Sequence, residues 1–334
     1  MKRLKKFKKE IVALHRDCLK QRVVSRLKSL IGTFGFTCPI QRLFLRQIQE
    51  FVDRQDGLVA SADVICRFVR YIEQVYFKHA DPIPEIFRPV NRALHDHVFV
   101  PVYENFCSYT YKKNANWGGP ALMRAILENV KYCPYCNAEM VYSIERDARA
   151  KDLKSAFDHF FPKGRYPFLA VSLYNLIPSC HRCNSDFKGD EWSRMLNIPH
   201  PYLDDLDDMA HFVPIDITGI WDTDKGCPDL QLTFVAKDVN MKAQVATHAD
   251  VFGINLVYRQ LFNGEAVKVI RKAKVLNENY VMQIRRWFES AGLRNINIEE
   301  MIYGTPIKHE SIDLYHMSKL KIDLYEQSVE NMRT

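Results

Sequence analysis

The sequence predicts a mostly helical α+β protein, in which a small central segment of short strands is flanked by helical N- and C-terminal regions. Two patterns carry this prediction. Apolar residues recur at helical spacing through most of residues 1–115 and 239–289, and again over about 310–330. Between the helical regions, short β-type runs and two pairs of cysteines mark out the central segment.

The N-terminal region begins with an apolar stripe whose members alternate spacings of three and four, as on one face of a helix. The stripe comprises Leu4, Phe7, Ile11, Leu14 and Cys18. It does not persist for the three or four heptads of a coiled coil, so we expect it to pack against the rest of the protein. Further helices are expected over 41–53, 61–78 and 87–97. In the C-terminal region, two short strands are expected at 215–220 and 230–235, before the later helices.

Composition places the chain among ordinary globular proteins. Its 334 residues, 47% hydrophobic and 26% charged, are enough for two or three domains. No apolar run approaches the ~20 residues of a membrane-spanning helix. The basic start is followed by His15, Arg16 and Asp17, which makes a poor secretory signal, so a cytoplasmic location without membrane contact is expected.

The net charge of +7 is unevenly distributed along the chain. Residues 1–30 hold eleven Lys or Arg against Glu10 and Asp17, whereas residues 201–240 hold nine Asp against two Lys. The basic start could contact nucleic-acid phosphates or could be a solvated helix face. The acidic stretch argues against a protein that coats DNA uniformly.

Four of the nine cysteines form two Cys-x-x-Cys pairs, Cys133–Cys136 and Cys180–Cys183. Paired thiolates at this spacing are typical of a tetrahedral zinc site, and four thiolates leave no open position, so the Zn²⁺ would be structural. The alternative is four unrelated thiols. The remaining cysteines are expected to be reduced and buried: Cys18, Cys38, Cys66, Cys107 and Cys227.

The segment between the two cysteine pairs carries residues suited to hydrolysis. We expect strands at 140–144 and 155–160, and a helix from His181 to Gly189. Asp158 and Asn184 offer oxygen ligands to a hard cation, and a neutral His159 imidazole can take a proton from water.

These residues resemble the HNH endonucleases, within the ββα-metal (His-Me finger) nucleases. The resemblance rests on Asp158-His159, Asn175-Leu176 and Cys180-x-x-Cys183-Asn184 with Lys188, and it spans about 133–190. It implies a central ββα-metal HNH module with structural zinc at 116–198, between helical regions at 1–115 and 199–334. The last motif position is Asn184 rather than His, a substitution that many family members share.

The resemblance also implies roles for single residues. His159 would be the general base, Asp158 and Asn184 would bind one Mg²⁺ or Mn²⁺, and Asn175 would brace the loop that carries His159. Three basic residues could contact phosphate or could simply be solvated: Lys163, Arg165 and Lys188. Because neighbouring strand residues point to opposite faces, Asp158 and His159 share a site only if the strand ends or kinks there.

The sequence after the motif, Pro199-His200-Pro201-Tyr202-Leu203-Asp204, and the later helices are similar to HNH effectors of bacterial anti-phage systems. Septu-type and retron-linked nucleases are examples of these effectors, which are paired with ATPases. This similarity implies that the helical regions dock a partner ATPase or another defence-system subunit, and that nuclease activity is held in check until triggered.

Three functions fit these observations. The favoured one is a metal-dependent endonuclease that acts on DNA or RNA. The second is a zinc-stapled nucleic-acid-binding or adaptor module without hydrolytic activity, and the third is a toxin-like effector that hydrolyses RNA. No motif separates DNA from RNA as the substrate, because no recognition module is evident in the sequence.

Overall fold

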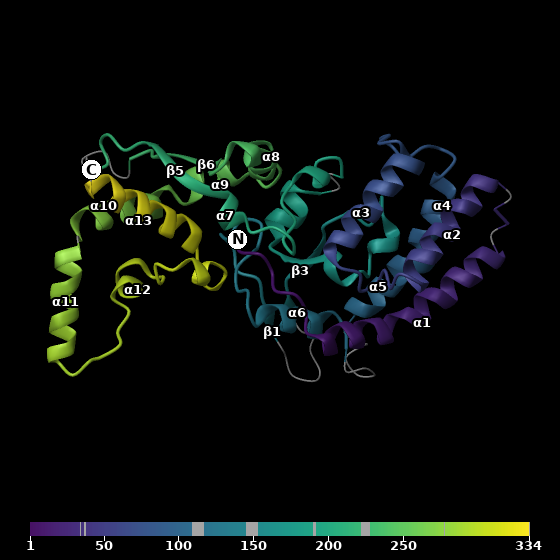
Figure 1. Ribbon diagram of the computed structural model, residues 1–334, viewed down its shortest axis with the longest axis horizontal. Coiled ribbons are helices and arrows are strands. Elements are labelled where there is room, and N and C mark those ends of the chain that lie inside the picture. The colour runs from purple at the N-terminus through teal and green to yellow at the C-terminus, as the bar shows by residue number, and fades with distance from the viewer. Residues whose placement is uncertain are drawn as a thin grey trace. The chain divides into compact units, whose positions relative to one another are not determined.

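A computed structural model describes residues 1–33, 35–36, 38–108, 117–144, 153–189, 192–221, 228–276 and 278–333. Cys227 and most of the loop expected between the first two strands lie outside these residues. The chain forms two compact units (Figure 1). Unit 1 comprises Met1–Arg3, Asn129–Met140 and Asp204–Thr334, and unit 2 comprises Leu4–Glu128 and Val141–Leu203.

The first part of unit 2 is helical, as the sequence predicts. Its helices are α1 (Lys9–Thr33), α2 (Pro39–Asp53), α3 (Ala62–Ile72), the π-helix η1 (Glu73–Phe77), α4 (Arg88–Ala93), the π-helix η2 (Leu94–Phe99), α5 (Val100–Cys107) and α6 (Gly119–Leu127). The helices expected over 41–53 and 61–78 are confirmed, with a π-helical end on the second. The helix expected over 87–97 continues to Cys107.

The predicted N-terminal stripe is partly wrong. Helix α1 begins at Lys9, so Leu4 and Phe7 precede it, and Leu14 is 42% exposed. The backbone N–H of Leu4 bonds the carbonyl of Pro201, which holds this stretch as an extended arm. The buried face of α1 is a different stripe at spacings of three and four: His15, Leu19, Val23, Leu27 and Leu30. Helices α1 and α2 lie side by side (Figure 1).

The second part of unit 2 is a small module of strands and short helices. Its elements are β1 (Ser143–Ile144), β2 (Leu153–Lys154), β3 (Ala156–His159), the 3₁₀-helices η4 (Pro167–Leu169) and η5 (Leu173–Asn175), β4 (Leu176–Ser179), the π-helix η6 (Arg182–Phe187) and the 3₁₀-helix η7 (Met195–Asn197). β1 pairs with β2 and β3 pairs with β4, both antiparallel. The helix expected from His181 is present as η6, and Gly189 follows with a φ of +49°, as expected of a residue that ends a helix.

The stretch that follows the module packs on it. His200 and Tyr202 are buried: the His200 ring lies 4.0 Å from the Phe160 ring, and the Tyr202 hydroxyl donates to the carbonyl of Leu176. His200 and Tyr202 therefore complete the core around β3 and β4.

Unit 1 is built on the hairpin of β5 (Ala210–Asp216) and β6 (Gln231–Ala236). Its other elements are α7 (Leu206–Met209), the 3₁₀-helices η8 (Val239–Met241) and η9 (His309–Leu314), α8 (Lys242–Val251), α9 (Ile254–Leu261), α10 (Asn263–Val275), α11 (Glu278–Ser290), α12 (Ile298–Tyr303) and α13 (Ser318–Arg333). The strand predicted at 215–220 is wrong in its bounds: Phe212 is buried in the hairpin, whereas Ile215 is 69% exposed.

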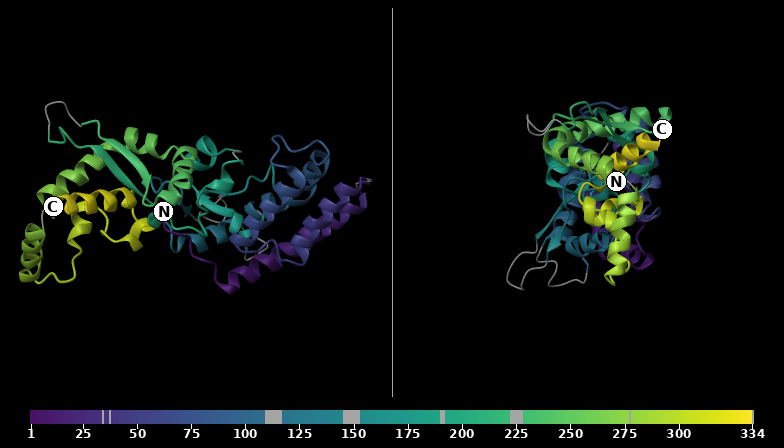
Figure 2. Two further views of the ribbon diagram at one scale, coloured as in Figure 1. Left: turned by 45° about the horizontal axis from the view of Figure 1, so that its top comes forward. Right: turned by 90° about the vertical axis from the view of Figure 1, so that its left-hand side faces the viewer.

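Helix α13 lies against α10 and against β5 (Figure 2). Two of its side chains hydrogen-bond the strand backbone: the Asp323 carboxylate accepts from the N–H of Phe212, and the Gln327 amide donates to the carbonyl of the same residue. These bonds satisfy strand groups that would otherwise need water. Among the described residues, no helix is both long enough and apolar enough to cross a membrane.

Candidate metal centre and catalytic site

The four cysteines of the two Cys-x-x-Cys pairs form one buried cluster. All four are free thiols, and their Sγ atoms lie within 4.8 Å of one another. Tetrahedral zinc with bonds of about 2.3 Å separates its sulfur ligands by about 3.8 Å. The cluster therefore could hold a metal ion such as Zn²⁺, and the donor set fits a closed structural site.

The first cysteine pair is held by contacts within unit 1. Asn137 follows the pair with a φ of +55°, and its amide donates to the carbonyl of Ile312. The Tyr258 hydroxyl donates to the carbonyl of Cys136 at 2.7 Å, and the ring of His248 donates through Nε2 to the carbonyl of Tyr135. No local sequence pattern predicts these contacts, because the contacting residues lie more than 100 positions away along the chain.

The second pair brackets the start of helix η6: Cys180 precedes the helix, and Cys183 lies in its first turn. The backbone N–H of Cys183 donates to the Cys180 sulfur at 3.4 Å, and the N–H of Asn184 bonds the carbonyl of Cys180. An N–H donated to sulfur favours the thiolate, which is the form that binds metal. Asn184 is fixed one residue after the pair, half-buried, and its amide nitrogen donates to Ser185 Oγ.

His159 ends β3 with its ring buried and oriented. Its Nε2 lies 3.0 Å from the carbonyl oxygen of Ala170. A carbonyl can only accept, so Nε2 carries the proton and Nδ1 keeps its lone pair. The Tyr103 ring packs edge-on against the imidazole, with 4.6 Å between ring centroids. Burial, and secondarily Lys163, lower the pKa of His159 to about 3, so the imidazole is neutral at pH 7.

Asn175 braces the chain after His159. Its amide oxygen accepts from the N–H of Phe161 at 2.8 Å, and its amide nitrogen donates to the carbonyls of Phe161 and Leu169. The side chain is fully buried, so these bonds are shielded from water. Leu169 directly precedes Ala170, the partner of the imidazole, so Asn175 fixes both ends of the loop that orients His159.

Asp158, the neighbour of His159 on β3, forms an ion pair with Lys188. The Lys188 Nζ lies 2.6 and 2.9 Å from the two carboxylate oxygens, and it also donates to the carbonyl of His159. Both side chains are buried. Asp158 and Asn184 fit a hard cation by donor type, but the Lys188 ammonium already neutralises the carboxylate. Lys188 thus binds a protein group where phosphate contact was predicted.

Arg165 also binds a protein group. Its guanidinium forms a two-pronged ion pair with Glu73 at 2.7 and 2.8 Å, and its Cζ lies 3.4 Å from the centroid of the Trp192 ring. The Tyr166 hydroxyl donates to the same carboxylate. Because Arg165 is only 5% exposed, the predicted phosphate contact is not supported, and Arg165 instead ties this loop to η1.

Lys163 lies beside the candidate base. Its Nζ is 5.8 Å from the centroid of the Tyr103 ring, and its side chain is half-buried rather than enclosed. Lys163 is therefore the one of the three predicted phosphate contacts whose placement fits that role. Tyr103 and Glu73 come from helices far from the motif in sequence, so no local pattern could have connected them with the site.

The chain is similar to the Septu protein PtuB of Bacillus thuringiensis. The two share 29% identity over 177 residues, which is 51% of this chain and 57% of that protein. The match thus covers little more than half of the length of this curated relative. No protein-family model and no solved structure matches the chain.

Proposed function

We propose that the protein is a metal-dependent HNH endonuclease that hydrolyses phosphodiester bonds in DNA or RNA. The observation that carries this proposal is the orientation of His159. Its Nε2–H is held by the Ala170 carbonyl, which leaves Nδ1 as a fixed, neutral proton acceptor. Asn175 bonds the backbone at both ends of the loop that carries the Ala170 carbonyl, and this supports a role that depends on the direction of the ring.

In this proposal each residue of the site has a distinct role. His159 accepts a proton from the attacking water through Nδ1, and Lys163 holds the phosphate nearby. Asp158 and Asn184 would hold a divalent cation, which when bound would supply Lewis-acid stabilisation of charge on the phosphate. The cysteine cluster would hold the module together through structural Zn²⁺.

We further propose that the protein is an effector of an anti-phage defence system. Its similarity to a Septu protein, PtuB, supports this role, as does the likeness of residues 199–204 to HNH effectors that are paired with ATPases. A partner ATPase or another defence-system subunit would then dock on the helical regions. The similarity to PtuB covers only about half of each chain, so it does not by itself assign a partner to this protein, and the partner is proposed.

The Lys188–Asp158 ion pair favours a second candidate, the zinc-stapled adaptor without hydrolytic activity. An ammonium that permanently neutralises Asp158 would remove one of the two ligands proposed for the cation. A nuclease requires that Lys188 share or release this carboxylate when the cation binds.

Incubation of the purified protein with plasmid, single-stranded DNA and total RNA separates the two candidates. The cation should be varied by adding or omitting Mg²⁺ or Mn²⁺, because a chelator would also remove zinc. Cleavage that depends on the cation and is lost in His159→Ala supports the nuclease, and the substrate cleaved separates DNA from RNA. Binding without cleavage in every arm supports the adaptor.

A further inference from the structure

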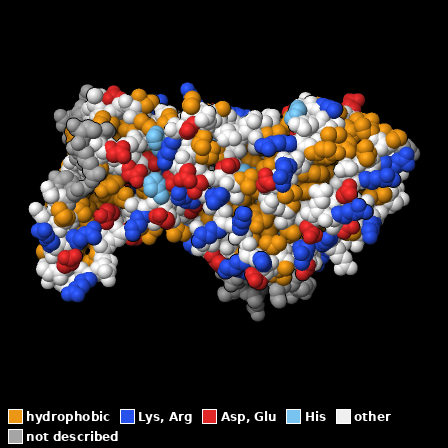
Figure 3. Space-filling view, in the orientation of Figure 1, with side chains coloured by type: hydrophobic (Ala, Val, Ile, Leu, Met, Phe, Trp, Pro, Cys, Tyr) orange, Lys and Arg blue, Asp and Glu red, His pale blue; other side chains and the backbone are white. Residues whose placement is uncertain are grey.

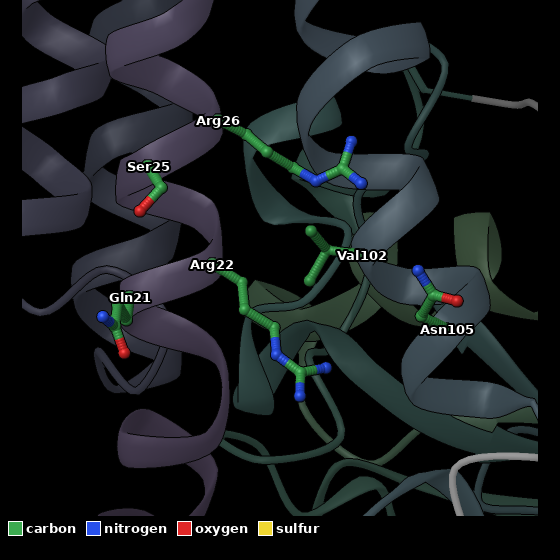
Figure 4. A pocket seen from close by; sticks show the side chains of 6 residues that line it. All are labelled: Gln21, Arg22, Ser25, Arg26, Val102 and Asn105. Atoms are coloured by element: carbon green, nitrogen blue, oxygen red, sulfur yellow. The ribbon is translucent and has the colours of Figure 1, made fainter.

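Helices α1 and α5 of unit 2 border an open groove of about 360 Å³ (Figure 4). Its lining consists of Gln21, Arg22, Ser25, Arg26, Val102 and Asn105. Val102 is buried and forms the floor, whereas the five polar side chains are exposed. The groove thus has an apolar base and a polar, accessible rim.

The rim is positively charged. Arg22 and Arg26 lie four residues apart and so share a face of α1, and both project toward α5 (Figure 4). Arg26 donates to the carbonyl of His97 at 2.9 Å, which orients the guanidinium without neutralising its charge. Ser25 and Asn105 add neutral donors. None of the six described lining residues is a carboxylate.

Several other cations of the basic N-terminal stretch lie within ion-pair distance of carboxylates. These are Lys2, Lys8, Arg16 and Lys20. Lys and Arg side chains are also visible over the helical part of the surface around α1 and α2 (Figure 3). The positive charge of this stretch is therefore offset nearby at these positions. The groove brings two guanidinium groups of the stretch together.

Helix α5 connects the groove to the candidate base. Tyr103 contacts His159, and Asn105, two residues along the same helix, lines the groove. At 100° per residue their side chains lie about 200° apart, on opposite sides of a helix about 10–12 Å wide. A nucleic-acid strand that rises about 3.4 Å per nucleotide crosses that width in about three nucleotides.

We propose that this groove binds a phosphate of the nucleic-acid backbone, about three nucleotides from the phosphate that His159 attacks. Arg22 and Arg26 would form the paired hydrogen bonds that guanidinium groups make to phosphate. The inference rests on the proposed endonuclease function and adds to it the contact that places the strand.

The test compares two double variants that remove the same charge from the same helix. Arg22→Gln/Arg26→Gln removes both positive charges from the groove. The control, Lys9→Gln/Lys28→Gln, removes two exposed positive charges of α1 that lie outside the groove. Affinity for labelled duplex DNA, single-stranded DNA and RNA is measured with the full-length, zinc-containing protein without added Mg²⁺. Equal far-UV circular dichroism and melting temperature verify that both variants fold.

The arginine variant should bind at least one nucleic acid about tenfold more weakly, and its slope of log K against log salt should fall by about 1.8, as expected for two lost phosphate contacts. The lysine variant should stay within about twofold of wild type. Equal affinities in the two variants would overturn the inference. The inference would also be overturned if the arginine variant lost binding of inorganic phosphate while its affinity for nucleic acid stayed equal to that of wild type.

Substitution of Glu104 is an independent test, in which nucleic-acid affinity should rise rather than fall. This exposed carboxylate lies on α5 between Tyr103 and Asn105, along the path that the strand would take. Glu104→Gln should therefore raise nucleic-acid affinity about two- to threefold at low salt. An unchanged or lower affinity would argue against a strand that crosses α5.

The outcome can be separated from that of the proposed function. If the wild-type protein cleaves nucleic acid and both double variants bind it equally, the proposed nuclease function is supported and strand binding by the groove is refuted. If the arginine variant loses binding but the wild-type protein never cleaves, strand binding by the groove is supported and the nuclease function is refuted.

Discussion

At the scale of single residues, one hydrogen bond decides which nitrogen of His159 can act. The Ala170 carbonyl fixes the proton on Nε2, and burial keeps the ring neutral. Asp158 forms an ion pair with Lys188, which also donates to the carbonyl of His159. His159 is the last residue of β3, so the strand ends at the point where it must end if the two residues are to serve one site.

Lys188 offers a test of the cation site. Lys188→Met removes the ammonium from a buried carboxylate, so the free energy of unfolding should fall by about 3–5 kcal/mol. If Asp158 binds a divalent cation, added Mg²⁺ should restore part of this loss in thermal unfolding, because the cation replaces the ammonium. The double variant Asp158→Asn/Lys188→Met is the control and should not respond. A Lys188→Met protein that also ignores Mg²⁺ would contradict the assignment of Asp158.

The candidate site residues were predicted from patterns that are local in sequence, and their catalytic roles stay predictions. Asp158, His159 and Asn175 were selected by a short motif, and the structure gives His159 and Asn175 hydrogen bonds that suit their predicted roles. Lys188 and Arg165 were assigned to phosphate because they are basic and close to the motif. Their buried partners depend on tertiary packing, which a short motif does not encode.

At the scale of elements, the Glu73–Arg165 pair joins η1 to the loop after β3. Glu73→Gln should cost about 3–5 kcal/mol of unfolding free energy, because it leaves a buried guanidinium without its carboxylate. Chemical denaturation measures this cost. The matched control is Asp63→Asn, which breaks the exposed Asp63–Arg67 pair and should cost less than about 1 kcal/mol. Equal costs in the two variants would show that the buried pair does not stabilise the loop.

Helix α1 gives the protein a pH-dependent stability. His15 donates from Nε2 to the Val171 carbonyl and accepts from Trp117, and burial lowers the pKa of His15 to about 4. Below about pH 6.5, His15 takes up a proton in the unfolded chain but not in the folded chain. The contribution of His15 to the free energy of unfolding therefore falls as the pH drops from about 6.5 to 4, by about 1.4 kcal/mol per pH unit.

His15→Gln should reduce this slope by up to one proton, because glutamine keeps the N–H for Val171 but cannot ionise. Urea unfolding across that pH range measures the slope. Unfolding at about pH 8 gives the reference, since the imidazole is neutral there in both states. A slope equal to that of wild type would contradict the account of His15.

Helices were predicted better than strand ends. α2 and α3 have regular apolar spacing, and their bounds follow from it. The strand β5 was misplaced because Ile215 and Ile220 suggested a continuous strand, whereas the hairpin buries Phe212 and leaves Ile215 exposed. The N-terminal stripe was wrong for a related reason. Leu4, which is buried, and Phe7, which is half-buried, lie in an extended arm before α1, and their spacing only resembles that of a helix.

At the scale of the whole molecule, the cysteine cluster closes a loop of more than 40 residues between the two pairs. Cys133→Ser and Cys180→Ser should each abolish stoichiometric zinc and lower the melting temperature by roughly 5 °C or more. Zinc analysis and calorimetry on the same samples test both effects. Cys38→Ser is the control, since serine is a preferred residue at this helix N-cap. A well-folded Cys180→Ser protein without zinc would contradict a stapling role.

The overall organisation was the least predictable level. The expected regions 1–115, 116–198 and 199–334 follow the order of the sequence, whereas the two compact units each draw on separated segments. Residues 129–140, for example, join unit 1 through Asn137 and Ile312. Such long-range contacts leave no periodic signal in the sequence. The division into these three regions stays a prediction.

The central claim is that His159 activates water for phosphodiester hydrolysis. The most direct test is the cleavage rate of nucleic acid with Mg²⁺ for wild type, His159→Gln and His181→Ala. Glutamine keeps an N–H for the Ala170 carbonyl but has no basic nitrogen, and His181 is an exposed histidine of the same module. We predict a loss of at least about 10²-fold in His159→Gln and a near-wild-type rate in His181→Ala. A His159→Gln protein that is folded and cleaves at the wild-type rate would contradict the claim.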